Sequence, residues 1–320
     1  MTMHLFESSR SPRTSTLRQA GLSLIELLVA VTIGGLLIFG ATQVYVDSRR
    51  TYEINESAAR LQETARYALS VLEPDIRMSN YWGLVKGAGV VTEQASPDDD
   101  QVPGDPTDCG RNFARHLVEN VAGTNGSTNL PCAAYRANVI ASADSLTIRR
   151  AAVSPSTAPG TRLRICSTRV AATVVTDAST CTPAPAGQLN DLIVNTYYIS
   201  QHSTDRPGYP SLRRISLVEG PAFRDEEIIP GVEDMQIEFG IDPTGMSGRA
   251  QRYVNPDEVN DGEQIVSVRI WLLIRAEAEE VGFLDDRTYQ YADRDPYQPN
   301  DRYRRLLVSR TIQVRNALGT

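Results

Sequence analysis

The stretch Gly21-Leu22-Ser23-Leu24-Ile25-Glu26 decides the fold of this chain, because it opens a long apolar run and places one carboxylate inside it. Residues 22–46 contain no charged residue other than Glu26. As a helix they would be about 37 Å long, enough to cross a hydrocarbon core of about 30 Å. The sequence therefore predicts a membrane-spanning helix with Glu26 near its start.

Glu26 needs a partner or a neutral form inside a membrane, since inserting a carboxylate there costs on the order of 2.5 to 3.5 kcal/mol. No Lys, Arg or His lies within the span to pair with it. Two interpretations remain open. Either Glu26 lies close enough to the boundary to reach water, or its partner is an amine on another molecule.

Charge and hydropathy around the span indicate a retained anchor. The 320 residues carry a formal net charge of −7, and residues 1–21 hold three arginines against one glutamate, so the rest is near −9. A general polyanion binder is not expected.

Arginines lie on both sides of the span, so charge does not decide its orientation. The run is much longer than the roughly 7 to 15 apolar residues of a cleaved secretory signal, so we expect it to be retained.

Gly21 followed by Leu22-Ser23-Leu24-Ile25-Glu26 and a long apolar helix resembles the class III signal of type IV pilins and type II secretion pseudopilins. In that family a membrane peptidase cuts after the glycine and methylates the new N-terminus. The resemblance implies cleavage between Gly21 and Leu22, removal of a leader over residues 1–21, and methylation of Leu22. It also implies that Glu26 pairs with the methylated N-terminus of an adjacent subunit during assembly, which supplies the missing amine.

A second helical pattern follows the span, over residues 47–73. Charged residues occupy one side, and apolar residues recur at three- and four-residue steps on the other. The apolar positions are Ile54, Ala58, Leu61, Ala65, Ala68, Leu69 and Leu72. Pro74 disfavours helical geometry at Glu73, so we expect the helix to end or kink there. The apolar face is expected to pack on a folded head.

The rest of the chain is rich in Val, Ile, Leu, Tyr and Thr in short runs, which is typical of strands. We expect strands at 145–150, 162–166, 170–176, 192–200, 212–218, 234–239, 265–275 and 306–314. Residues 74–137 are expected to be an irregular insertion with a short helix around 113–121, and residues 138–320 a β-rich head. The predicted fold class is α+β, with a long N-terminal helix packed on an antiparallel sheet.

Three further stretches narrow the resemblance to minor pilins of the PilW type. They are Asp75-Ile76-Arg77-Met78-Ser79-Asn80-Tyr81-Trp82-Gly83, the strand Val232-Glu233-Asp234-Met235-Gln236, and Thr311-Ile312-Gln313-Val314-Arg315-Asn316. The resemblance covers the chain up to Gly83 and most of it after Leu192. Many of those proteins have a cysteine after the glycine, where this chain has Leu84, so no disulfide is carried over there.

The four cysteines all lie in the part assigned to the periplasm, an oxidising compartment. Four cysteines allow three pairings, and we favour the local one, Cys109 with Cys132 and Cys166 with Cys181. Free buried thiols are the alternative. The spacings are too wide for a CxxC metal or redox motif.

Catalytic and ligand motifs find little support in the sequence. His116 and His202 lack a convincing constellation, and no G-x-S-x-G or phosphate-binding glycine loop occurs. We expect no enzyme, no cofactor and no metal site, and interpret Asp98-Asp99-Asp100 as a solvated acidic loop. Three arginine clusters are interpreted as solvated sheet faces or subunit contacts, and no nucleic acid partner is expected. They comprise Arg149, Arg150, Arg162, Arg164 and Arg169; Arg213 and Arg214; and Arg302, Arg304, Arg305 and Arg310.

The resemblance implies a structural subunit that primes assembly of a type IV pilus, with roles in fimbrial biogenesis, twitching motility and adhesion. Its expected partners are prepilin peptidase, other minor pilins, the major pilin, the assembly platform and inner membrane lipid. The expected location is the inner membrane, with a periplasmic head, and the pilus exterior if the subunit is incorporated. Two alternatives stay open: the large, J-type minor pseudopilin of a type II secretion system, and an adhesin or DNA-binding tip module.

Overall fold

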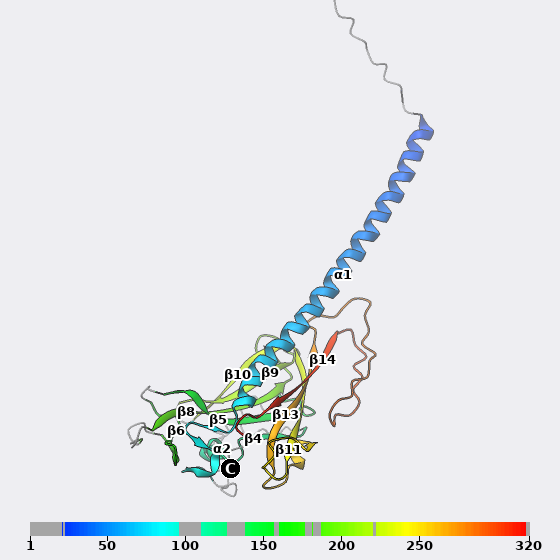
Figure 1. Ribbon diagram of the computed structural model, residues 1–320. Helices are drawn as coiled ribbons and strands as arrows, with labels where there is room; N and C mark the ends of the chain where they lie inside the picture. Colours follow the sequence, from blue (N-terminus) through cyan, green and yellow to red (C-terminus); the bar gives the residue numbers. More distant parts are fainter. Residues whose placement is uncertain are drawn as a thin grey trace, which may run out of the picture. The chain divides into compact units, whose positions relative to one another are not determined.

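The computed structural model describes residues 21, 23–95, 110–126, 138–156, 160–176, 181, 187–219 and 222–317. The chain divides into two compact units, Met1–Ile54 and Asn55–Thr320. Helix α1 (Leu24–Met78) contributes residues to both units (Figure 1). The two units are described in turn.

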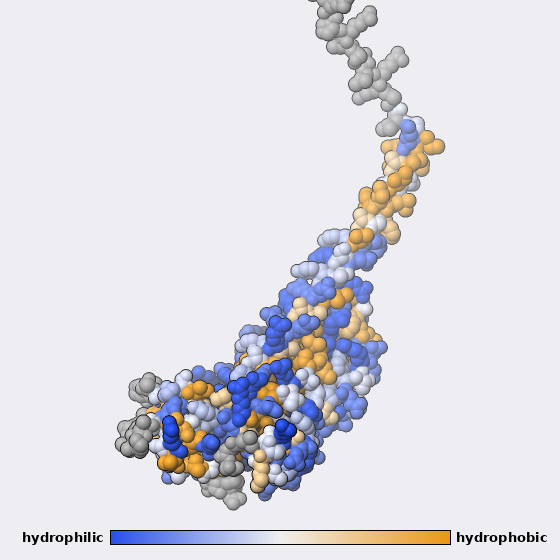
Figure 2. Space-filling view, viewed as in Figure 1, coloured by the Kyte–Doolittle hydropathy of each residue, from blue (hydrophilic) through white to orange (hydrophobic). Residues whose placement is uncertain are grey.

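In the first unit, α1 is apolar and unpacked. Its large side chains from Leu24 to Val46 are exposed, and an 18-residue window has a mean hydropathy of 2.3 with 0% of its residues buried. Figure 2 shows this stretch as a mostly orange surface. By length and composition the helix can cross a membrane, as the sequence predicts.

In the second unit, α1 buries the face that the sequence predicts. Leu61, Ala65, Ala68 and Leu72 are buried, as is Ile76 one turn later. We expected the helix to end or kink at Glu73, and an end there is wrong, because α1 continues through Pro74 to Met78. Proline removes one helical hydrogen bond, but packing of the buried Ile76 and an ion pair between Arg77 and Glu73 hold the last turn.

The strands of the second unit form two large sheets and one hairpin, where the sequence led us to expect one sheet. The hairpin pairs β1 (Tyr81–Trp82) with β2 (Val85–Lys86). The eight-stranded sheet contains β3 (Val91–Thr92), β4 (Val121–Thr124), β5 (Ser145–Pro155), β6 (Arg164–Ser167), β7 (Ala172–Val175), β8 (Gln188–Ser200), β9 (Ser211–Leu217) and β10 (Phe223–Pro230). The four-stranded sheet contains β11 (Val232–Asp242), β12 (Arg252–Val254), β13 (Gln264–Arg275) and β14 (Arg305–Gln313).

Strand order places the long antiparallel strands at the centre of each sheet. The larger sheet runs β10-β9-β8-β6-β7-β3, with β5 pairing both β8 and β4. Its pairs are antiparallel except β3 with β7, which is parallel. The smaller sheet runs β12-β11-β13-β14 and is antiparallel. The fold class is therefore α+β, with antiparallel-rich sheets.

The main core lies where α1 meets both sheets. It joins the buried helix residues to side chains such as Tyr197 of β8, Ile237 of β11 and Ile312 of β14. The predicted alternation along β13 is confirmed, since its inward side chains are buried: Val266, Val268, Ile270, Leu272 and Ile274. A second core, including Trp82 and Val194, covers the other face of the larger sheet.

The segment 74–137 is more regular than the sequence suggests. It supplies strands β1 to β4, the 3-10 helix η1 (Ala88–Val90) and a short helix, α2 (Gly110–Arg115). The helix comes earlier than the expected 113–121, because the residues from Val121 onward form β4 and pair with β5. A further 3-10 helix, η4 (Pro256–Glu258), follows β12.

Candidate functional site

Ser23 and Glu26 form a capping box at the start of α1. The Glu26 backbone N–H donates to the Ser23 Oγ at 3.2 Å, and the Ser23 N–H donates to the Glu26 Oε2 at 3.0 Å. The Leu27 N–H then donates to the Ser23 carbonyl at 3.1 Å and begins the helix. Gly21 is exposed, and Leu22 lies outside the described residues. Among the described residues, Glu26 therefore has a neutral backbone donor and no cation.

Asp75, the first residue of the D-I-R stretch, is the buried polar centre at the end of α1. Its Oδ2 accepts hydrogen bonds from Asn195 Nδ2 and Tyr197 Oη, both at 2.6 Å, and Arg150 Nη2 lies 2.6 Å from its Oδ1. Burial, and then the charge of Asp75, raise the pKa of Tyr197. The phenol therefore stays protonated and keeps donating to Asp75, which ties the helix to β5 and β8.

Asn80 brings the D-I-R stretch to the C-terminal T-I-Q-V-R-N stretch. Its Nδ2 donates to the Asn316 carbonyl at 2.8 Å, and its Oδ1 accepts from Trp82 Nε1 at 2.8 Å. In return, Asn316 Nδ2 donates to the Ser79 carbonyl at 3.2 Å. The backbone of Asn80 has φ +60, a left-handed conformation that Asn tolerates better than most residues. The D-I-R stretch and the C-terminal T-I-Q-V-R-N stretch are therefore hydrogen-bonded to each other.

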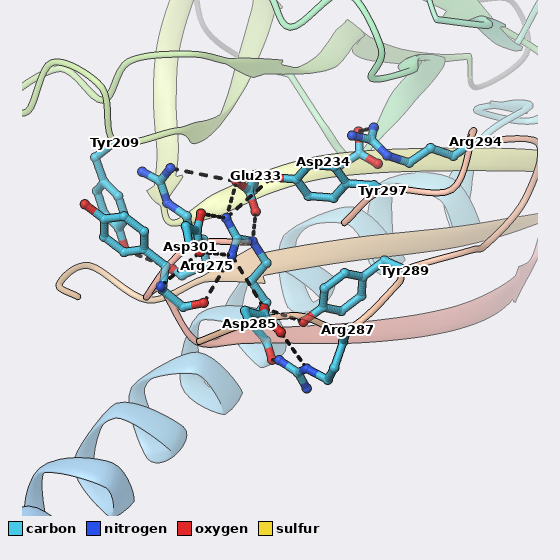
Figure 3. A network of polar contacts seen from close by, with 12 residues as sticks. Tyr209, Glu233, Asp234, Arg275, Asp285, Arg287, Tyr289, Arg294, Tyr297 and Asp301 are labelled. Carbon is cyan, nitrogen blue, oxygen red and sulfur yellow. Dashed lines mark hydrogen bonds and ion pairs between the residues drawn. The ribbon is translucent and has the colours of Figure 1, made fainter. Parts of the chain in front are cut away.

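Glu233, from the V-E-D-M-Q strand, belongs to a charged network around Arg305. The Arg305 side chain is 1% exposed and bonds Glu233 Oε2 at 2.5 Å and Asp301 Oδ1 at 2.7 Å, with Asp285 Oδ2 at 3.5 Å. Figure 3 shows the carboxylates of Glu233, Asp285 and Asp301 around a shared guanidinium group. Burial alone would lower the pKa of Arg305, but its hydrogen bonds to Asp301 and Glu233 raise it. The guanidinium stays charged and joins β11 to β14.

Asp234 and Asp144 extend this buried polar layer along β11. Asp234 accepts from Tyr291 Oη at 2.5 Å. It also lies 2.8 Å from Arg294 Nη1 (Figure 3). Asp144 accepts from the backbone N–H groups of Gly126 at 2.9 Å and Ile237 at 2.8 Å. Burial raises the pKa of Asp144 to about 7. Asp144 therefore changes its protonation state near neutral pH.

The cysteine prediction is confirmed for one pair. Cys166 of β6 and Cys181 form a disulfide with a Cα–Cα distance of 5.7 Å. Cys109 and Cys132 lie outside the described residues, so their pairing stays a prediction.

The interpretation of the arginine clusters as solvated faces or subunit contacts is wrong for four members. Arg149, Arg164, Arg213 and Arg305 are buried. Arg149 donates to the carbonyls of Phe113 and Glu119, while the other three pair with carboxylates of this chain. Sequence reasoning missed this because the acceptors lie on other strands, helices or loops, and no spacing rule connects them with the arginines. These arginines hold the fold together.

The described residues contain no cluster of three His, Cys, Asp or Glu side chains able to hold a metal ion. The Nδ1 of His202 accepts from the Gly208 N–H at 2.8 Å, which gives it a structural role. Asp98, Asp99 and Asp100 lie outside the described residues.

Two family models match the chain. The model of the type IV pilus-assembly protein W, PilW, matches residues 196–316, and the prokaryotic N-terminal methylation motif matches residues 16–42. Together the two matches support a minor pilin of the PilW type. The methylation motif of the minor pilin contains the Ser23–Glu26 capping box, and its PilW region contains Glu233, Arg305 and Asn316.

The solved structures include a chain that is similar to this one. A type IV-like pilin from Thermus thermophilus is 13% identical, with 81% of this chain and 98% of that chain covered and a TM-score of 0.38. No curated protein matches. The PilW match supports a role in type IV pilus assembly over one in type II secretion. The apolar helix and the methylation motif fit a membrane-anchored pilin. The two matched family regions are structural ones.

Proposed function

We propose that the minor pilin is cut between Gly21 and Leu22, is methylated on Leu22, and primes pilus assembly through Glu26. The observation that carries this proposal is the position of Glu26. It is the one charged residue of an exposed apolar stretch, and the described residues offer it no cation. Among the described residues, its carboxylate accepts a hydrogen bond from the Ser23 N–H.

The capping box gives this proposal a physical mechanism. Before assembly, the Ser23 N–H holds the Glu26 carboxylate at the helix start with a neutral donor. A hydrogen bond from a cationic amine is about twice as strong as one from a neutral donor. The methylated N-terminus of a neighbouring subunit would therefore displace Ser23 as the partner of Glu26. In a membrane this exchange favours one axial register between subunits, because any other register leaves the carboxylate without a cation.

The same proposal places the anchor in the inner membrane and the second unit in the periplasm. The disulfide between Cys166 and Cys181 supports an oxidising compartment for that unit. The partners are then prepilin peptidase, other minor pilins, the major pilin and the assembly platform. Because Glu26 needs an incoming amine, we place the subunit beneath another minor pilin rather than at the extreme tip.

Pilus counts in a complemented deletion strain test the role of Glu26. The strain expresses the natural chain, Glu26→Ala, or Glu53→Ala, which removes an exposed carboxylate of α1 beyond the apolar stretch. We expect the Glu53 control to restore pili and the Glu26 variant to restore few or none at equal membrane levels. Natural pilus numbers with Glu26→Ala would overturn the proposal. Loss of protein secretion with normal pili would instead support the type II system.

A further inference from the structure

A hollow of about 290 Å³ opens on the face of the larger sheet that packs against α1. Its ionisable lining consists of Asp75, Arg150, Arg162, Arg214, Arg224 and Glu226. In the sheet register, Arg214 lies opposite both Tyr197 and Glu226. Residues that lie opposite each other share a face, and Tyr197 packs in the core with α1. The hollow is therefore a part of this sheet face that the helix leaves open.

Two of the four arginines form ion pairs with the carboxylates of the hollow. Arg150 pairs with Asp75, with Nη2 to Oδ1 at 2.6 Å. Arg214 Nε donates to Glu226 Oε1 at 2.8 Å, which also accepts from Ser216 Oγ at 3.3 Å. Both carboxylates of the lining are thereby occupied.

The other two arginines have no partner among the carboxylates of the lining. Arg162 Nε is 3.9 Å from Asp191 Oδ2, but Asp191 also pairs with the buried Arg164 at 3.0 Å. Arg162 Nη2 donates to the Leu217 carbonyl at 3.2 Å, whereas its buried Nε atom has no hydrogen-bond acceptor among the described residues. Arg224 is exposed and has no carboxylate within ion-pair distance in the described part of the chain. Four arginines against two lining carboxylates leave an excess of two positive charges.

We infer that this hollow binds a small oxyanion, a carboxylate or a phosphate group, through Arg162 and Arg224. Guanidinium groups present paired N–H donors whose spacing matches the oxygens of these anions. Ile193 and Val218 also line the hollow and offer apolar surface to the carbon frame of such a ligand. The volume lies at the small end of ligand sites, which suits a compact anion or the charged end of a larger molecule.

This site lies in the second unit, and no step of the proposed assembly mechanism uses it. It gives a structural subunit a ligand-binding surface of its own. The inference does not depend on Glu26, so a variant at Arg224 is expected to leave pilus numbers unchanged while removing anion binding.

Calorimetry on the full chain in detergent, in Tris buffer at pH 7 and constant ionic strength, tests the site. The probes are inorganic phosphate and malonate. We expect single-site binding of at least one probe, weakened about tenfold or more by Arg224→Gln and by Arg162→Gln, because each removes a charge-assisted hydrogen bond. Arg302→Gln, an exposed arginine outside the hollow, is the matched control and should bind like the natural chain.

The two probes identify the chemistry of the ligand. Binding of phosphate alone indicates a phosphate-bearing ligand, binding of malonate alone a carboxylate, and binding of both a general oxyanion site. Arg224 is exposed, so its variant is expected to fold, and an unchanged melting temperature checks this. The inference is overturned if neither probe gives saturable heat, or if the Arg224 variant binds as tightly as the Arg302 control.

Discussion

Asn80 and Asn316 join two segments that are 236 residues apart, through a 2.8 Å hydrogen bond from the Asn80 side chain to the Asn316 carbonyl. The Asn316 side chain returns a bond to the carbonyl of Ser79. The Arg315 N–H also donates to the Arg77 carbonyl at 3.1 Å. The end of the long helix and the segment after the last strand are thus hydrogen-bonded directly to each other.

Substitutions at Asn80 should distinguish the stability that its side-chain hydrogen bonds provide from the cost of its left-handed backbone conformation. Asn80→Gly removes the bonds to Asn316 and Trp82 but accepts φ +60, whereas Asn80→Ala also adds backbone strain of roughly 1–2 kcal/mol. We expect both to lower the free energy of unfolding and Ala to lower it more. Thermal unfolding in detergent measures the difference, and equal effects would contradict the left-handed assignment.

Arg305→Lys should be strongly destabilising. Arg305 holds Glu233 and Asp301 with separate nitrogens, an arrangement that a single ammonium cannot reproduce. We expect a loss of about 3 kcal/mol, because the partly buried carboxylates of Glu233 and Asp301 are left poorly paired. Arg252→Lys is the control, since its pair with Glu263 lies near the surface and should change stability by less than about 1 kcal/mol. Similar melting temperatures for the two variants would refute the role given to the network.

Removing the Cys166–Cys181 disulfide should lower stability through the unfolded state. The bridge spans 15 residues, and a loop of that size is worth about 3 kcal/mol in the chain-entropy description. The double variant Cys166→Ser, Cys181→Ser is compared with the natural chain by thermal unfolding without reductant. An unchanged melting temperature would show that the bridge contributes nothing to the fold.

Stability should fall as pH rises through the range in which Asp144 titrates. Burial raises its folded pKa to about 7 from an unfolded value of 3.8. Between these values the folded state holds a proton that the unfolded state has lost, so raising the pH favours unfolding. We expect the melting temperature to fall from pH 5 to pH 8, and to fall less in Asp144→Asn. Parallel pH profiles of the two proteins would exclude Asp144 as the cause.

Much of the fold could be predicted because its strands are marked by local pattern. The alternation along β13 and the helical spacing before Leu72 each specify a buried face without tertiary information. Strand β10 was missed, since its Asp225, Glu226 and Glu227 resemble a solvated turn. Those carboxylates pair with Arg213 and Arg214 of the adjacent β9. Only the strand register reveals that partnership.

Part of the candidate site is visible in the sequence. Gly21, Leu22 and Glu26 stand out in the sequence because a charge after a glycine interrupts an apolar run. The Ser23 cap follows a known local rule and could have been found. The contact of Asn80 with Asn316 could not, because no spacing rule connects residues so far apart. The helix end was misjudged for the same reason, as tertiary contacts overrode Pro74.

The N-terminal mass of the protein purified from membranes tests the central claim most directly. Intact mass spectrometry should find residues 22–320 carrying one added methyl group, and Gly21→Val should leave the chain uncut. An uncut natural chain, or an N-terminus at any other residue, would contradict the account of this protein as a processed minor pilin.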